Sequence, residues 1–266
     1  MSASPGKPAP RFENKVAIVT GACRGIGQAI ALAFAREGAH VVSVCVHDSA
    51  GVAGEMKSLG ARFTPYTRDF AALDQKAAVA LVAEIVKDCG RLDILVNNAG
   101  TIRRAPVVDH PEADWNAVLQ INLSAPFFLT QAASKWWLTT GRANSPSAAR
   151  FKVVNIASML SFQGGILVPG YAASKSGLAA VTKAFANELA KERMNFNAIA
   201  PGYIATDNTR PLRDDPVRGK AILDRIPEAR WGTPDDIAGA SLFLASSDAD
   251  YLNGAIINVD GGWLAR

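Results

Sequence analysis

Short apolar runs rich in β-branched residues alternate along this chain with longer segments that repeat apolar residues every three or four positions. The first example is VAIVT (16–20), which leads through a glycine-rich turn into GQAIALAFAREG (27–38). Runs of the first kind predict strands, and those of the second kind predict helices. The same criteria predict further strands at 41–46, 62–66, 92–97, 151–157, 195–200 and 254–259, and further helices near 50–59, 73–90, 112–139 and 171–193.

This alternation predicts an α/β fold in which a parallel, doubly wound sheet of about seven strands is covered by helices on both faces. No internal repeat or linker divides the chain, so we expect one domain over residues 14–266. Residues 1–13 predict a flexible arm and not a secretory signal, because their start has three prolines and no apolar core. The polar segment TGRANSPSAAR (140–150) predicts a surface loop.

Composition narrows the class of protein. The chain has 266 residues, 49% of them hydrophobic and 20% charged, with a formal net charge of +4 and no long run of basic residues. We therefore expect no nucleic-acid partner, no membrane insertion and, at most, a small acidic substrate. The three cysteines, Cys23, Cys45 and Cys89, lack metal-site spacing and lie in or beside apolar segments, which predicts reduced thiols in the cytoplasm. The three histidines have no ligand spacing, so we expect no metal.

The turn TGACRGIG (20–27) joins the first predicted strand to the first predicted helix. Gly21, Gly25 and Gly27 would allow a tight turn and a close approach of the backbone to a pyrophosphate, which the helix N-terminus would also bind. A glycine triplet alone is a weak signal, and a tight turn without a ligand is the alternative. The position between the first strand and the first helix favours a dinucleotide site.

The segment YAASK places Tyr171 and Lys175 four residues apart, on one face of a helix. A tyrosine hydroxyl has an ordinary pKa near 10, and a nearby ammonium group would lower that pKa. The pair therefore predicts an acid/base group. A tyrosine beside a surface lysine, without function, is the alternative that the spacing alone leaves open.

Together with NNAG (97–100) and PGYIAT (201–206), these motifs resemble those of the short-chain dehydrogenase/reductase family, over residues 14–263 and in the same order. The resemblance implies a Rossmann-like fold and hydride transfer with NAD or NADP. It assigns Tyr171 as acid/base, Lys175 as the group that lowers the tyrosine pKa and binds ribose, Ser158 as the substrate orienter, and Asn122 as part of a proton relay. It places the cofactor against Gly21, Arg24, Gly25, Ile26, Gly27, Cys45, Asp69, Asn98, Ala99, Gly100, Tyr171, Lys175, Pro201, Gly202, Ile204 and Thr206. Asn97 is expected to brace the sheet.

The choice between NAD and NADP stays open in the sequence. Cys45 holds the position where an acidic residue would bind the ribose hydroxyls, and Arg24 lies where NADP-using relatives hold the 2′-phosphate. Both residues favour NADP. Asp48 is a second candidate ribose ligand, however, and the branch of the family that the chain resembles most favours NAD.

The segments GTIRR, NIASMLSFQGG, ILDRIPEARWG and VDGGWLAR resemble those of this branch. The resemblance implies a substrate of the keto-deoxy sugar acid class. Arg103 and Arg104 follow the fourth predicted strand, at the edge of the sheet where substrates bind. Because a guanidinium group binds carboxylates in a fork, we expect Arg103 to hold the substrate carboxylate and Arg104 to be solvated. Gln163 and Trp263 are further candidate substrate contacts.

Two other functions remain as alternatives. A reductase of 3-oxoacyl thioesters, or of other carbonyl compounds, would suit TGACRGIG and would need no carboxylate-binding arginine. A non-catalytic nucleotide-binding protein could keep the glycine turn without the acid/base group. The family also implies a homo-oligomer, with a tetramer expected.

Overall fold

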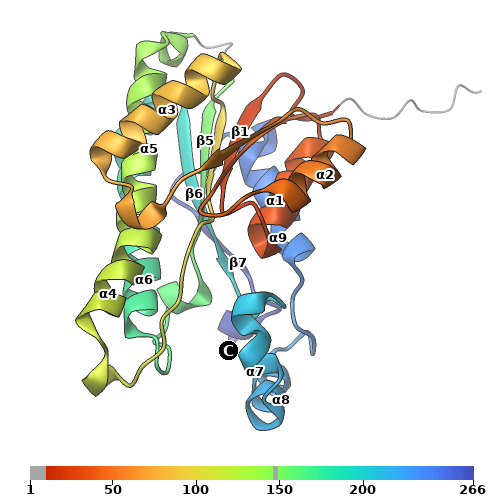
Figure 1. Cartoon of the computed structure of the whole chain (residues 1–266), viewed down its shortest axis with the longest axis vertical. Helices are drawn as coiled ribbons and strands as arrows, with labels where there is room; N and C mark the ends of the chain where they lie inside the picture. The colour runs from red at the N-terminus through yellow and green to blue at the C-terminus, as the bar shows by residue number, and fades with distance from the viewer. Residues whose placement is uncertain (1–9, 146–148) are drawn as a thin grey trace, which may run out of the picture.

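The computed structural model describes residues 10–145 and 149–266, which form one parallel sheet between two layers of helices (Figure 1). The strand order is β3-β2-β1-β4-β5-β6-β7, and every pairing is parallel. The strands are β1 (Val16–Thr20), β2 (His40–Cys45), β3 (Phe63–Thr67), β4 (Ile94–Asn97), β5 (Phe151–Ile156), β6 (Met194–Pro201) and β7 (Ile256–Val259). The predicted doubly wound α/β fold is therefore confirmed, and the chain order reverses between β1 and β4.

Each face of the sheet carries its own apolar core, as strands buried on both sides require. The helices are α1 (Gly25–Arg36), α2 (Ala50–Ser58), α3 (Gln75–Cys89), α4 (Glu112–Leu119), α5 (Ala125–Thr139), α6 (Pro169–Leu189), α7 (Arg210–Arg213), α8 (Pro216–Arg225) and α9 (Pro234–Ala245). Figure 1 shows α1, α2 and α9 on one side and α3, α5 and α6 on the other. The helices α7 and α8 lie beyond the carboxyl ends of the strands, next to the crevice where ligands bind in such folds (Figure 1).

The helical region predicted over 112–139 is interrupted. A π-helical turn, Gln120–Ser124, separates α4 from α5. The helix α4 packs against α6, whereas α5 packs against α3. Periodicity in the sequence did not reveal this turn, because one extra residue in a helix leaves the apolar pattern on either side intact.

The expected arm does not extend to residue 13. Its first nine residues lie outside the described part of the chain, but Phe12 is buried, with its ring centroid 4.9 Å from that of Phe34 in α1. Arg11 adds an ion pair to Glu37 at 3.0 Å. These residues belong to the folded domain, because the Phe12 ring is part of its apolar core. In the predicted loop 140–150, residues 146–148 lie outside the described part.

The expectation of three reduced thiols is wrong for two of them. Cys23, in the turn after β1, and Cys45, the last residue of β2, form a disulfide with a Cα–Cα distance of 6.5 Å. The two positions are 22 residues apart in the chain and become neighbours only because β1 and β2 pair in parallel. Cys89 is free. Among the described residues, no helix is long and apolar enough to cross a membrane.

Candidate active site

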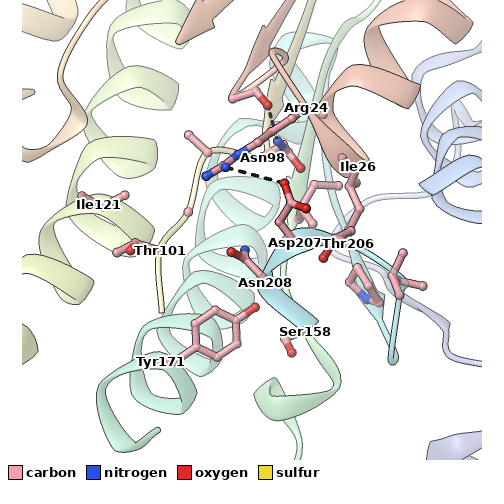
Figure 2. Close-up of a pocket in the computed structure, with 18 of the residues that line it drawn as sticks. Arg24, Ile26, Asn98, Thr101, Ile121, Ser158, Tyr171, Thr206, Asp207 and Asn208 are labelled. Atoms are coloured by element: carbon pink, nitrogen blue, oxygen red, sulfur yellow. Dashed lines mark hydrogen bonds and ion pairs between the residues drawn. The ribbon is translucent and has the colours of Figure 1, made fainter. Parts of the chain in front are cut away.

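A cavity of about 590 Å³ opens at the carboxyl ends of β1, β4, β5 and β6 (Figure 2). It gathers most of the residues that the sequence singled out, although they come from segments far apart in the chain. The predicted site residues that line it are Gly21, Arg24, Gly25, Ile26, Gly27, Asp69, Asn98, Ala99, Gly100, Arg103, Ser158, Tyr171, Lys175, Pro201, Gly202, Ile204 and Thr206.

The glycine turn has the shape that a dinucleotide needs. Gly21 and Gly25 have positive φ angles of 66° and 56°, which side-chain-bearing residues rarely adopt. A Cβ on Gly27 would lie 2.2 Å from the Gly21 carbonyl oxygen, so only glycine lets helix α1 approach the turn this closely. Arg24, the N-cap of α1, makes no side-chain capping hydrogen bond. The amide groups of the first turn are thus available to a phosphate, and the residues fit a nicotinamide dinucleotide.

A second set of contacts, which sequence analysis missed, holds this turn against the end of β4. The Thr20 hydroxyl accepts hydrogen bonds from the amides of Asn98 and Ala99, both at 2.9 Å. The Asn98 side chain donates to the Thr20 carbonyl at 2.9 Å. One cavity wall is therefore cross-braced before any ligand arrives. The signal in the sequence was the polar Thr20 at the end of an otherwise apolar strand.

Asn97 braces the sheet as predicted. Its side-chain amide donates to the Thr130 hydroxyl at 2.9 Å and to Asn155 Oδ1 at 2.8 Å. Asn97 and Asn155 are opposite one another in the β4–β5 register, so the hydrogen bond ties these strands directly below the cavity.

Tyr171 and Lys175 lie one turn apart in α6, and Ser158 follows β5 directly. Lys175 Nζ lies 5.7 Å from the centroid of the Tyr171 ring and donates to the Ile156 carbonyl at 2.6 Å. Figure 2 shows the Tyr171 hydroxyl directed into the cavity near Ser158. The side chains of Ser158 and Lys175 are almost fully buried. The three polar groups therefore converge on one small region of the cavity.

Asn122 sits within the π-helical turn and is completely buried. Its side-chain amide donates to the Thr101 carbonyl at 2.9 Å and to the Ser174 hydroxyl at 3.1 Å, and its Oδ1 accepts from the Thr101 amide at 2.8 Å. Asn122 does not line the cavity itself. A Cβ on Gly100 would lie 3.3 Å from Asn122 Oδ1 and 3.7 Å from Lys175 Nζ, so the small Gly100 separates the two side chains.

Burial dominates the ionisation of the acid/base pair in the free protein. It lowers the pKa of Lys175 from its ordinary value of 10.5 to about 8. It raises the pKa of Tyr171, against smaller lowering effects of the Ser158 hydrogen bond and the Arg104 charge. The prediction that Lys175 lowers the pKa of Tyr171 is thus wrong for the free protein. The spacing YxxxK shows that the two groups share a face of the helix, but it does not show how deeply that face is buried from solvent.

The rim of the cavity carries exposed charges held in weak pairs. Arg103 lies 3.5 Å from Asp114, with 52% of its side chain exposed. Arg104 is exposed, as predicted, and in addition donates a hydrogen bond to the Asn208 carbonyl at 3.1 Å. Arg24 lies 3.8 Å from Asp207, the residue before Asn208 (Figure 2). Asp207 and Asn208 line the cavity and were not predicted from the sequence.

Three further predicted site residues lie away from the cavity lining. Cys45 is fully buried in its disulfide, and the next residues of the chain, Val46 and His47, take its expected place in the lining. Trp263 is buried and packs against Tyr203, with the Arg225 guanidinium 4.0 Å above its ring. Gln163 is partly exposed and does not line the cavity. The structure therefore gives no support to the candidate substrate contacts of Gln163 and Trp263.

This fold, with its glycine turn and its serine, tyrosine and lysine on one cavity, defines a dinucleotide-dependent oxidoreductase. The family model described as enoyl-(acyl carrier protein) reductase matches residues 21–264, and the chain belongs to the short-chain dehydrogenase/reductase family.

Several relatives share most of the chain. It is 48% identical to the 2-dehydro-3-deoxy-D-gluconate 5-dehydrogenase of Escherichia coli K12, over 96% of this chain and 97% of that protein. The enzyme of the same name from Bacillus subtilis 168 is 47% identical, over 96% of each chain. Among solved structures, the gluconate 5-dehydrogenase of Burkholderia cenocepacia J2315, in complex with NADP and tartrate, is 32% identical with a TM-score of 0.89, over 97% of this chain and 98% of that one.

Proposed function

We propose that this enzyme transfers hydride between a nicotinamide dinucleotide and the keto or hydroxyl group of a deoxy keto sugar acid of the 2-dehydro-3-deoxy-gluconate type. The observation that carries the proposal is a cavity that is lined by Ser158, Tyr171 and Lys175 and also by the exposed Arg103. Arg104 lies beside this cavity, hydrogen-bonded to the lining residue Asn208. The similarity to 2-dehydro-3-deoxy-D-gluconate 5-dehydrogenases over nearly the whole chain supports the same substrate class.

The base of the cavity supplies the proton chemistry. When bound, the nicotinamide ring donates or accepts the hydride. In the reductive direction Tyr171 gives its phenolic proton to the substrate oxygen, and Ser158 orients that oxygen by a hydrogen bond. In the oxidative direction the Tyr171 phenolate takes the proton back. The raised pKa of Tyr171 in the free protein keeps the phenol protonated at neutral pH, which suits reduction. Lys175 binds ribose, and Asn122 completes a proton relay.

The charged rim of the cavity selects substrates that carry a carboxylate. Within residues 10–145 and 149–266, Arg103 is paired with Asp114 alone, at 3.5 Å, and such exposed pairs contribute about 0–1 kcal/mol. A substrate carboxylate can displace Asp114 and form a two-point contact with the Arg103 guanidinium. This assignment of Arg103 rests on its place in the lining and on the chemistry of guanidinium groups.

We propose NADP as the preferred cofactor. The cavity lining beyond β2 consists of Val46 and the basic His47, and Arg24 lies in the adjoining glycine turn. These residues can accommodate the 2′-phosphate of NADP. An acidic residue in their place would instead repel the phosphate and bind the free ribose hydroxyls of NAD. Solved relatives, including one from Agrobacterium tumefaciens that is 49% identical over 98% of this chain with a TM-score of 0.88, bind NADP.

A parallel screen tests both proposals. Turnover of keto-deoxy sugar acids and of 3-oxoacyl thioesters is followed by absorbance at 340 nm, with NADH and NADPH in separate reactions. We expect activity on the sugar acids, with higher kcat/KM for NADPH. Arg103→Ala is expected to raise KM for the sugar acid at least tenfold and to leave residual thioester reduction unaffected. Equal loss on both substrates, or thioester turnover alone, would refute the sugar-acid assignment.

We also propose a homotetramer in the cytoplasm, as the family resemblance implies. Size-exclusion chromatography with light scattering tests the subunit number, and fractionation of the producing cells tests the location. A monomer at micromolar concentration would contradict the first, and recovery of the enzyme outside the cytoplasmic fraction would contradict the second.

A further inference from the structure

The disulfide between Cys23 and Cys45 joins two neighbouring segments of the cavity lining. Cys23 lies inside the glycine turn, between Gly21 and Gly25, and lines the cavity. Cys45 ends β2, and the chain continues from it into Val46 and His47, which also line the cavity. The bond therefore connects the glycine turn to the segment that, in the proposed dinucleotide complex, would lie beside the adenosine end.

The two sulfur atoms differ in access. Cys23 is partly exposed on the cavity surface, whereas Cys45 is completely buried among the apolar residues of β2. An external reagent can reach only Cys23. Disulfides are uncommon in the cytoplasm, and those that do form there are usually transient, with catalytic or redox-sensing roles. The difference in access gives an external thiol or disulfide one defined sulfur atom with which to react, as a reversible site requires.

We propose that Cys23 and Cys45 form a reversible dithiol/disulfide site whose oxidation state sets the affinity of the enzyme for its dinucleotide. The proposal rests on a nicotinamide dinucleotide binding in this cavity, and the oxidant is a small disulfide of the glutathione class.

The exchange proceeds in two steps. The Cys23 thiolate attacks one sulfur of oxidised glutathione and releases a first glutathione thiolate, which leaves a mixed disulfide on Cys23. The Cys45 thiolate then attacks Cys23 Sγ and releases the second glutathione. The two cysteines lose two electrons, one glutathione disulfide becomes two thiols, and those thiols take up the two protons that the cysteines give up. Reduction follows the same steps in reverse, with attack on the accessible Cys23 Sγ.

The bond changes binding by fixing the turn in advance. Cys23 and Arg24 lie in the turn before α1 and line the cavity, and the bond adds a covalent tie between this turn and the end of β2. Without it, only hydrogen bonds hold the turn, and binding must also restrict its remaining motion. Ordering a segment on binding reduces affinity, whereas a cross-link that holds the bound conformation increases it. The disulfide form should therefore bind the dinucleotide more tightly than the dithiol form.

The test uses Cys89→Ser, which removes the remaining free thiol at the far end of α3, away from the cavity. The protein is equilibrated in glutathione buffers of different redox ratio, and its thiols are counted by alkylation and mass spectrometry. NADPH affinity is then measured by fluorescence in each state. We expect the dithiol form to bind about three- to tenfold more weakly. Because coupling is reciprocal, NADPH should shift the glutathione ratio at half-oxidation by the same factor.

Matched variants isolate the bond from the side chains. In the same background, Cys23→Ser leaves only the buried Cys45, so its NADPH affinity should not respond to the glutathione ratio. Cys45→Ser should instead stop at the mixed disulfide on Cys23, which alkylation and mass spectrometry detect as a glutathione adduct. The proposal is overturned if Cys23 and Cys45 stay reduced at every ratio, or if both states bind NADPH equally. NADPH binding without sugar-acid turnover would refute the proposed substrate alone, and failure to bind NADPH in either state would overturn the redox proposal itself.

Discussion

The groups at the base of the cavity and those at its rim differ in how deeply they are buried and in how firmly they are held. Ser158 and Lys175 at the base, and Asn122 behind the lining, are almost fully buried and are fixed by hydrogen bonds of 2.6–3.1 Å to the backbone or to neighbouring side chains. At the rim, Arg103 and Arg104 are exposed, and within the described part of the chain each is held by one weak contact. Proton transfer requires dry groups at fixed positions, whereas selection of a substrate requires charges that can exchange one partner for another. The experiments below test that division, from the largest expected effect to the smallest.

Tyr171→Phe should separate chemistry from binding most sharply. It removes the hydroxyl that we propose exchanges a proton with the substrate, so kcat should fall by about 10³-fold or more. The affinity for NADPH should change by no more than about twofold, because the ring remains to cover the cavity. The change is measured by absorbance at 340 nm and by a fluorescence titration. Tyr251→Phe, at a fully exposed tyrosine, is the control and should leave both unchanged. Turnover retained in Tyr171→Phe would invalidate the acid/base assignment.

Lys175→Met should lower activity and raise stability together. Burial reduces the pKa of Lys175 from 10.5 to about 8, so at pH 7 the folded protein holds a charge that would be better solvated in the unfolded chain. The unfolded state binds more protons between about pH 8 and 10.5, so this penalty fades as pH rises through that window. After loss of the hydrogen bond to the Ile156 carbonyl, we expect about 1–2 kcal/mol of added stability at pH 7 and about a 10²-fold loss of kcat.

Urea unfolding at pH 7 and pH 10 measures this effect. The gain in stability should be larger at pH 7 than at pH 10. Lys191→Met, at a lysine whose side chain is 81% exposed, is the matched control and should show neither change. A variant that is less stable than the parent at both pH values would show that burial of Lys175 does not oppose folding.

Gly27→Ala tests the close approach at the dinucleotide wall. The added methyl group would lie 2.2 Å from the Gly21 oxygen and 2.4 Å from Asn98 Nδ2, so the turn must move away from α1. We expect NADPH to bind about 10- to 100-fold more weakly and the free energy of unfolding to fall by about 1–3 kcal/mol. Gly51→Ala in α2, where a Cβ meets nothing within 4 Å, should not weaken binding. Equal NADPH titrations for Gly27→Ala and the parent would argue against a phosphate site here.

Arg104→Gln should have the smallest effect and tests whether the rim acts on the base. The Arg104 charge lowers the pKa of Tyr171, so its removal should raise that pKa further. For oxidation, which needs the phenolate, the rise of kcat/KM with pH should move to higher pH, and the rate at pH 7 should fall a few-fold. Arg36→Gln, at an exposed arginine in α1, should leave the profile in place. An unshifted profile for Arg104→Gln would show that rim and base are electrostatically independent.

The sequence predicted the base of the cavity better than the rim. Gly27 and Tyr171 lie in motifs whose spacing is tied to one turn or one helix, so local patterns indicate them, whereas Ser158 was assigned by the family resemblance. The pairing of Cys23 with Cys45, and of Arg24 with Asp207, depends on strand order and on loop paths, which periodicity does not encode. The pKa of Tyr171 was missed for a similar reason, because burial depends on the packing of several elements. Trp263 was misplaced because an aromatic residue near a site can equally belong to a neighbouring core.

The π-helical turn at Gln120–Ser124 has a consequence for how this helical region tolerates changes in length. Each residue of a helix adds a rotation of about 100°, so deleting one residue there would rotate α4 relative to α5 by that amount. The helix α4 would then present a different side to α6, and Asn122 would leave Thr101 and Ser174. Substitutions on the outer surface of this region should be tolerated. Its number of residues is fixed, because α4 must pack against α6 while α5 packs against α3.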